Sequence, residues 1–162
     1  MYTQYDYNNE LYHYGIKGMK WGVRKDPGVV SARQNYKQAK KAYNKAFNKW
    51  YWRMPGVTAK KRHENQYKYA DALSKAGDLG VAKGKLIEAK GKASGNSKKI
   101  AKGKYVAQRA SITKAYNTKV RDLVGEGYTY NESILKTIPQ RNEAIKKQQD
   151  LNATYRKNKI KY

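Results

Sequence analysis

The fold is decided by a stretch that reads SARQNYKQAKKAYNKAFNKWYWR, residues 31–53. It contains no Gly or Pro and is rich in Ala, Lys and Gln, which favour helix. Ser31 can cap its N-terminus, and Pro55-Gly56 can end it. Its aromatic and small residues recur at heptad-like spacing: Tyr36, Ala39, Tyr43, Ala46 and Trp50, with Phe47 beside them. The stretch therefore predicts a long helix with one aromatic face.

Glycines recur in the chain after this helix. A second helix is expected from Thr58 to about Ala76, with Gly77 as its C-terminal stop. Residues 77–103 hold six glycines, each of which costs a helix interior about 1 kcal/mol relative to Ala. We therefore predict a Gly-rich connector over residues 77–103, with short helical pieces such as Val81–Lys90 and a flexible break around Ser94-Gly95-Asn96-Ser97.

The remainder is again helical by pattern. A third helix is expected from about Ser97 to Val124, ended by Gly125-Glu126-Gly127. The last helical region begins near Asn131, and Thr137-Ile138-Pro139-Gln140 fits a capping box that restarts a helix within it. No fixed-period repeat is convincing.

The predicted fold is mainly α, with extended helical hairpins or a small bundle. A flexible N-terminal segment, residues 1–26, precedes a basic helical region, residues 27–162. That region divides into a helical hairpin (27–76), the connector (77–103) and a further helical part (104–162). Because the apolar stripes are narrow, we expect a partner to complete the core.

Composition argues against a compact enzyme. Among 162 residues only 24 are Leu, Ile, Val or Phe, whereas 36 are Lys or Arg and 12 are Asp or Glu, a net charge of +24. The absence of cysteine excludes disulfides and thiolate metal sites. Neither a membrane span nor a signal peptide is recognisable, so a soluble protein of a reducing cytoplasm is expected.

The charge lies almost entirely after residue 26. Residues 1–26 carry a net charge of +1, and residues 27–162 carry +23. Lysine-rich helix faces neutralise phosphates without reading sequence, and the interleaved tyrosines can stack on unpaired bases. The alternative is that these lysines only keep the helices soluble. The candidate nucleic-acid-binding residues are Lys37, Lys40, Lys41, Lys45, Lys49, Lys98, Lys99, Lys102, Lys104 and Arg109.

Residues 11–25 have the composition of a linear docking peptide. Three glycines alternate with apolar anchors and bases, which suits a segment that orders on a partner around a Trp hot spot. The alternative is that the segment packs on the protein's own helices. The candidate partner-binding residues are His13, Gly15, Ile16, Lys17, Gly18, Met19, Lys20, Trp21, Gly22, Val23 and Arg24.

The string from His13 to Arg24, HYGIKGMKWGVR, resembles the short HxGxKGMKWGxR peptide of many proteins from tailed phages and prophages of Gram-positive bacteria. In those proteins the peptide accompanies otherwise dissimilar sequences, often products of the head (capsid and portal) gene region. The resemblance covers about 15 of the 162 residues. It implies phage origin and a role in the head, with capsid or portal proteins as partners.

Candidate chemistry is sparse. The two histidines, His13 and His63, stand fifty positions apart, and His63 and Glu64 point about 100° apart on a helix. We expect no metal site, no cofactor and no enzymatic activity.

Two functions remain open. The favoured one is a non-enzymatic virion or head-assembly protein, located in the virion and in the host cytoplasm during assembly, that docks through its N-terminal peptide and meets DNA, RNA or an acidic protein surface through basic helices. The alternative is a free, sequence-nonspecific DNA- or RNA-binding protein of phage origin.

Overall fold

The computed structural model describes residues 26–51 and 59–160, which are helical except for short turns. No strand occurs among them, and the predicted mainly α fold is confirmed. The elements are α1 (Pro27–Tyr51), α2 (Ala59–Ala93), α3 (Ser97–Gly125), α4 (Tyr130–Lys136) and α5 (Ile138–Ile160).

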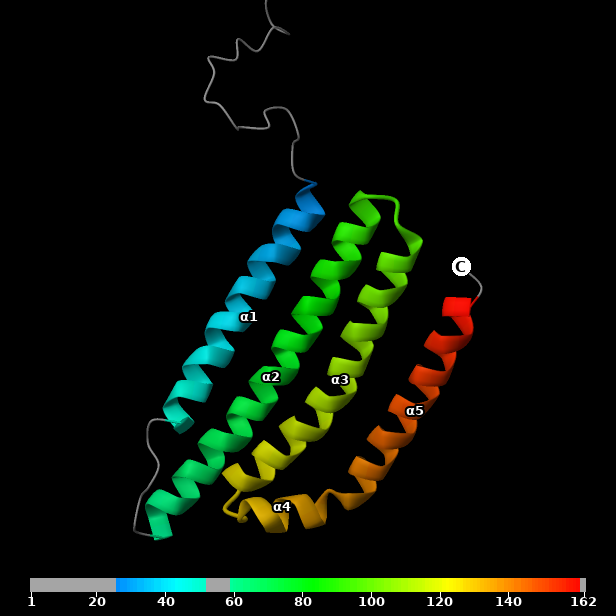
Figure 1. Cartoon of the computed structure of the whole chain (residues 1–162). Coiled ribbons are helices and arrows are strands. Elements are labelled where there is room, and N and C mark those ends of the chain that lie inside the picture. Colours follow the sequence, from blue (N-terminus) through cyan, green and yellow to red (C-terminus); the bar gives the residue numbers. More distant parts are fainter. Residues whose placement is uncertain (1–25, 52–58, 161–162) are drawn as a thin grey trace, which may run out of the picture.

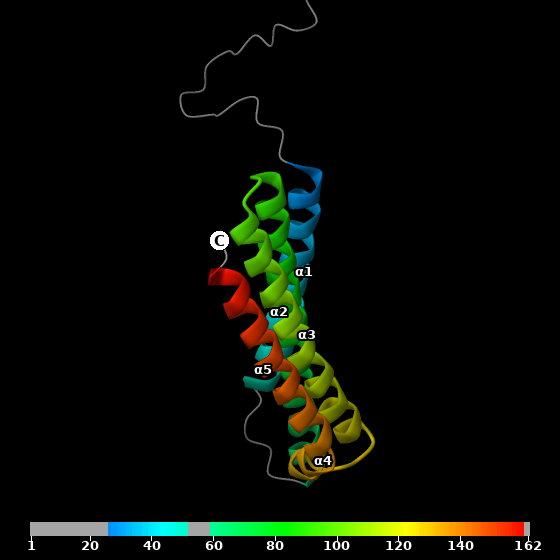
Figure 2. The ribbon, with the colours of Figure 1, turned by 90° about the vertical axis from the view of Figure 1, so that its right-hand side faces the viewer.

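The four long helices form a single layer. Figure 1 shows α1, α2, α3 and α5 side by side in that order, with the short α4 crossing one end. Figure 2, turned by 90°, shows the layer edge-on. α1 contacts α2 but not α3, and α5 contacts α3 and α4 but not α2. The layer therefore does not close into a cylinder, and both of its faces stay open.

The α2–α3 pair is held by backbone contact at glycines. A Cβ on Gly77 would lie 2.6 Å from the Cβ of Lys114, and a Cβ on Gly91 would lie 2.7 Å from the backbone nitrogen of Ile100. A Cβ on Gly84 would overlap the backbone of Ala107. Real Cβ atoms do not approach other atoms so closely, so these positions accept only glycine unless the helices separate.

The same contacts repeat along the whole pair. Gly80 faces Ala110, and on the other helix Gly103 faces the backbone of Glu88. The paired residue numbers add to nearly the same value throughout, as expected for antiparallel helices in one register. Small residues let the backbones approach more closely than the usual 8–10 Å between helix axes, and so increase van der Waals contact.

The predicted connector over residues 77–103 is therefore wrong. α2 continues without interruption through Gly77 to Ala93, and only Ser94, Gly95 and Asn96 separate it from α3. Helix propensity counts the cost of each glycine but not the contact that it permits with a second helix. The turn is made by Gly95, whose φ of 62° favours glycine, and Asn96 caps α3 by accepting from Lys99 N–H at 2.9 Å.

A helix restarts at Ile138, the first residue of α5, as predicted, but the two predicted caps differ from the structure. α1 begins at Pro27, because the Asp26 carboxylate accepts from Val29 N–H at 3.0 Å, so the predicted cap at Ser31 is wrong. Thr137 does not form a box with Gln140; its hydroxyl donates back to Ser133 O at 2.8 Å. The predicted stop at Pro55-Gly56 lies outside the described residues.

The capping box belongs to α4. The Thr129 hydroxyl accepts from Glu132 N–H at 3.3 Å, and the Glu132 carboxylate accepts from Thr129 N–H at 2.8 Å. The Glu132 carboxylate also accepts from the Thr129 hydroxyl at 2.8 Å. The bond from the backbone N–H, and then the bond from the hydroxyl, stabilise the ionised carboxylate and lower the pKa of Glu132. α3, predicted from Ser97 to Val124, is found from Ser97 to Gly125.

The apolar core is small and is extended by aromatic rings. The buried apolar side chains among the described residues are Ala46, Ala70, Ala72, Val120, Leu123 and Val124. A row of rings with centroids 5.0 to 5.8 Å apart joins α1 to α2 and α4: Tyr43, Phe47, Trp50, Tyr69 and Tyr130. Burial, with the neighbouring Tyr69, raises the pKa of Tyr130 to about 12. These rings supply the apolar area that the few aliphatic residues do not.

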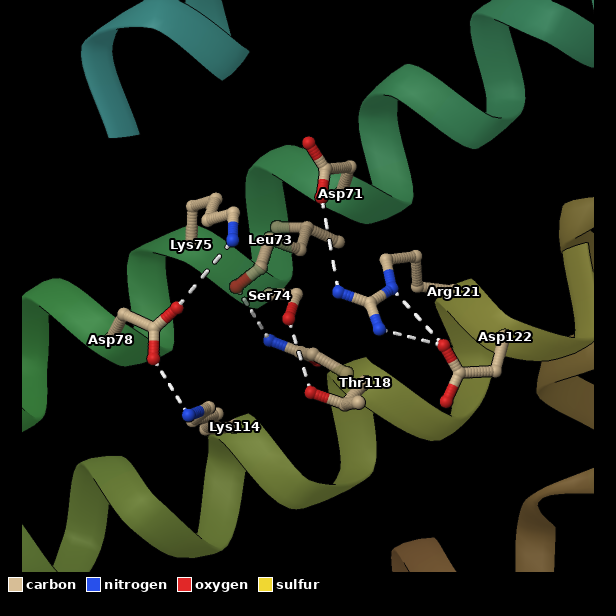
Figure 3. A network of polar contacts seen from close by, with 10 residues as sticks. Asp71, Leu73, Ser74, Lys75, Asp78, Lys114, Thr118, Arg121 and Asp122 are labelled. Atoms are coloured by element: carbon tan, nitrogen blue, oxygen red, sulfur yellow. Dashed lines mark hydrogen bonds and ion pairs between the residues drawn. The ribbon is translucent and has the colours of Figure 1, made fainter. Parts of the chain in front are cut away.

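Polar contacts continue the α2–α3 pairing where the glycines end (Figure 3). The hydroxyls of Ser74, which is buried, and Thr118 lie 3.0 Å apart, and the side-chain amide of Asn117 donates to Leu73 O at 3.1 Å. Each bond joins the two helices, so a buried polar group is satisfied across the interface.

Gly84→Ala should destabilise the fold even though alanine is the better helix former. The added methyl must push α2 from α3, at a cost of about 1–3 kcal/mol that exceeds the gain of about 1 kcal/mol in helix propensity. Urea unfolding followed by circular dichroism measures the difference. Gly125→Ala is the control, because its Cβ would meet nothing nearer than 3.4 Å. A Gly84→Ala protein more stable than wild type would contradict the account.

Thr129→Ala should lower the free energy of unfolding by about 1 kcal/mol, because it leaves N-terminal amides of α4 without a cap. Because the pKa of Glu132 is lowered in the fold, its contribution is present above the unfolded-state pKa of about 4.3 and is lost as pH falls through the folded value. Thermal melting of wild type and Glu132→Gln between about pH 3 and 6 checks this. Parallel pH profiles for the two proteins would refute it.

Candidate polyanion-binding surface

Basic residues concentrate in one half of the α2–α3 hairpin. Residues 81–109, which include the turn, carry nine Lys or Arg and a single acid, Glu88. The rest of the hairpin, residues 59–80 and 110–128, carries eight Lys or Arg and five acids. In Figure 1 the basic half is the upper one, where the N-terminal end of α1 also lies.

Four of the five acids of the other half form ion pairs. Asp78 lies 2.7 Å from Lys114 of α3 and 4.0 Å from Lys75 (Figure 3). Arg121 binds Asp122 at 2.7 Å and lies 3.9 Å from Asp71. The hydrogen bond to Asp122 raises the pKa of Arg121 further. This half carries a net charge of +3, from eight bases and five acids, against +8 in the basic half, from nine bases and one acid.

The predicted lysines of α1 form one exposed edge of the layer. Heptad positions on the opposite side of this helix, such as Ala39, Ala46 and Trp50, are buried or half-buried against α2. The five lysines are all exposed: Lys37, Lys40, Lys41, Lys45 and Lys49. Lys40 and Lys49 are nine residues apart, about 180° of helical rotation, so the five lysines spread over the outward half of α1 and turn toward both faces of the layer.

The predicted bases of α3 are exposed but do not form one patch. Lys102 and Arg109 are seven residues apart and share a side of the helix, whereas Lys104 lies about 200° of helical rotation from Lys102. Lys98 and Lys99 occupy the first turn. The structure therefore divides this group between the two faces of the layer.

Sequence reasoning missed four lysines on α2, because it assigned them to the connector. Lys83, Lys85 and Lys92 are exposed, and so is Lys90. The available signal was a tetrapeptide, Ala-Lys-Gly-Lys, which occurs at residues 82–85, 89–92 and 101–104. Its first two copies are seven residues apart, the spacing that returns to one side of a helix.

Two of the tyrosines interleaved with these lysines, Tyr43 and Tyr105, pack on other rings inside the layer. Tyr105 of α3 stacks on Tyr155 of α5, with ring centroids 4.3 Å apart, and donates to Asn152 at 2.6 Å. Tyr43 packs on Phe47 at 5.8 Å. Both tyrosines are half-buried, so the prediction that they stack on unpaired bases would require these contacts to break.

Two open grooves lie between helices. One of about 440 Å³ runs between α1 and α2, and one of about 350 Å³ runs between α3 and α5. On the rim of the second, the hydrogen bond and charge of Lys147 lower the pKa of Glu143. A carboxylate held ionised in this way does not supply a proton at neutral pH.

The described residues offer little further chemistry. No group of three or more His, Asp or Glu among them is placed to hold a metal ion. Of the helices in this part of the chain, none has the length and apolarity that a bilayer crossing requires. The candidate partner-binding residues from His13 to Arg24 lie outside the described residues.

Comparison with known proteins separates the N-terminal segment from the helices. Residues 4–28 match a family model described as a family of unknown function (DUF7211). The match ends at Gly28, the second residue of α1. No curated protein and no solved structure matches the chain. The matched segment contains the whole string from His13 to Arg24, and the boundary agrees with the composition change at Asp26.

Tyr105→Ala should loosen α5 rather than abolish nucleic-acid binding. It removes both the stacking on Tyr155 and the bond to Asn152, and should cost about 2–3 kcal/mol of stability. Amide hydrogen exchange of residues 138–160 should therefore rise sharply. If instead α5 stays protected and single-strand binding weakens by about 1–3 kcal/mol, Tyr105 is a base-stacking residue.

Proposed function

We propose that this chain is a non-enzymatic structural or head-assembly protein of a phage particle. It docks on a head component, capsid or portal, through the peptide from His13 to Arg24 and meets a polyanion through its basic helices. The observation that carries the proposal is the separation of charge along the hairpin, with nine bases and one acid in residues 81–109. A surface with this excess of positive charge is expected to face either solvent or a negatively charged partner.

The N-terminal segment supports the docking part of the proposal. The family match covers residues 4–28 and stops where the helical layer begins, as expected of a short peptide carried beside an unrelated body. Its resemblance to the phage peptide suggests the head as the destination. The helical layer, with two open faces, then provides the surface that contacts genome or shell.

A second function rests on the same basic half. A free DNA- or RNA-binding protein needs phosphate contacts but no place in a particle, and residues 81–109 would serve it equally well. The two functions differ in location. Mass spectrometry of purified virions separates them: a particle that yields capsid and portal peptides but none from this chain overturns the virion proposal.

Trp21→Ala should remove the chain from particles while leaving its helices intact. Trp21 is the largest apolar anchor of the peptide and precedes α1, so its loss should affect docking and not the fold. We expect incorporation to fall at least about tenfold, the effect of a hot spot worth more than about 1.4 kcal/mol. Tyr2→Ala, which lies outside the matched segment, is the control. Equal incorporation of Trp21→Ala and wild type would show that the peptide is not the anchor.

A further inference from the structure

The repeated tetrapeptide places its lysines on opposite faces of the layer. In each copy the glycine lies at the α2–α3 contact: Gly84, Gly91 and Gly103. Neighbouring residues of a helix are about 100° apart, so the lysine before each glycine and the lysine after it turn to opposite sides. The tetrapeptide is thus a glycine contact flanked by one base on each face.

Antiparallel pairing gathers the preceding lysines on one face. A two-fold axis perpendicular to the layer relates two antiparallel helices, so residues that directly precede a contact position lie on the same face in both. Arg109 belongs with them, because it precedes Ala110, which faces Gly80. We call this the Lys90 face; its regularly spaced α2 and α3 bases are Lys83, Lys90, Lys102 and Arg109, and Lys99, which precedes Ile100, adds a fifth base in the first turn of α3. The lysines that follow the glycines form the Lys92 face: Lys85, Lys92 and Lys104.

The bases of the Lys90 face form a regular array. Because Gly91 faces Ile100 and Gly84 faces Ala107, Lys90 lies level with Lys102, and Lys83 lies level with Arg109. Seven helical residues separate the two levels by about 10 Å, and the helices are no further apart than that. Four exposed cations therefore stand roughly 10 Å apart on a flat surface.

α1 widens the same face. Asn35, Gln38 and Ala42 line the groove beside Lys85, which puts them on the Lys92 face. Bases that follow the half-buried positions of α1 lie on the other face: Arg33, Lys37 and Lys40. The Lys90 face thus spans three helices.

The two faces differ in acid content. Glu88, the only acid between residues 81 and 109, pairs with Lys92 at 2.9 Å. Among the described residues, the Lys90 face in the basic half of the hairpin has no acid to balance its bases. The Lys90 face is therefore the one that needs an external anion.

We propose that the Lys90 face binds the phosphate backbone of double-stranded nucleic acid without reading its sequence. This rests on the proposed function and names its ligand and surface. Lysines act as point charges toward phosphates, and an array on a flat face contacts the backbone of a duplex without entering a groove. Single strands are bound mainly by stacking on exposed aromatic rings, whereas Tyr105 is stacked on Tyr155 and Tyr43 packs on Phe47.

The matched variants come from the tetrapeptides themselves. Lys83→Gln, Lys90→Gln and Lys102→Gln together remove three positive charges from the Lys90 face, and Lys85→Gln, Lys92→Gln and Lys104→Gln together make the same charge change on the other face. The full-length proteins are titrated with a fluorescent duplex of about 30 base pairs, from roughly 50 to 200 mM salt. Circular dichroism confirms that helix content is equal.

The Lys90-face variant should lose about three units of the slope of log affinity against log salt, and roughly 10²-fold in affinity near 100 mM. The other variant should lose less than about 5-fold, because its charges lie about a Debye length away. Equal losses in both would overturn the proposal, as would tighter binding to oligo(dT) of equal length or no duplex binding by the wild type.

A second measurement uses the unmodified protein. Duplex DNA should protect Lys83, Lys90 and Lys102 from acetylation, read by mass spectrometry, and leave Lys85 and Lys104 reactive. Uniform protection of both sets overturns the proposal even if a variant misfolds. If duplex DNA does not protect these lysines but the chain is incorporated normally into particles, the duplex-binding inference is wrong and the virion proposal stands. If the lysines are protected but the chain is absent from particles, the virion proposal is wrong and the duplex-binding inference stands.

Discussion

The close approach of α2 and α3 determines the rest of this structure. Glycines at positions such as Gly84 and Gly103 bring two backbones into direct contact, in a chain with only 24 Leu, Ile, Val or Phe residues. Many small dispersion contacts between backbones take the place of interdigitated aliphatic side chains. The same contacts fix the register of the two helices, and the register decides which lysines lie level with one another.

Elements outside this pair depend on different interactions. α1 joins α2 through a row of rings that includes Trp50 and Tyr69, and α5 joins α3 through Tyr105. Because each added helix lies beside the pair rather than across it, the layer keeps two open faces. One half of the hairpin balances its charge by pairing Asp78 and Asp71 with bases of α3, and the other half leaves its bases exposed. The ion-paired half and the basic half therefore lie at opposite ends of the α2–α3 hairpin.

Local patterns predicted the parts of the fold that local physics decides. The aromatic spacing from Tyr36 to Trp50 gave the buried side of α1, and the limits of α3 were correct to about one residue. Gly77 was interpreted as a helix stop because helix propensity describes an isolated helix. In the structure Gly77 lies inside α2 against Lys114 of α3, where a side chain would not fit. The heptad spacing of the Ala-Lys-Gly-Lys tetrapeptides carried that information. Exposure of the α1 lysines was readable, but the division of the α3 bases between faces depends on register, which spacing alone does not give.

The central claim, that glycine-mediated contact pairs α2 with α3, is tested most directly by nuclear Overhauser effects in the isotope-labelled protein. The structure predicts strong cross-peaks between the Hα protons of Gly84 and the backbone of Ala107, and between Gly103 and Glu88. Helices at the usual separation of 8–10 Å would not give backbone-to-backbone peaks at these positions. Their absence, with α2 still helical through residue 93, would contradict the account.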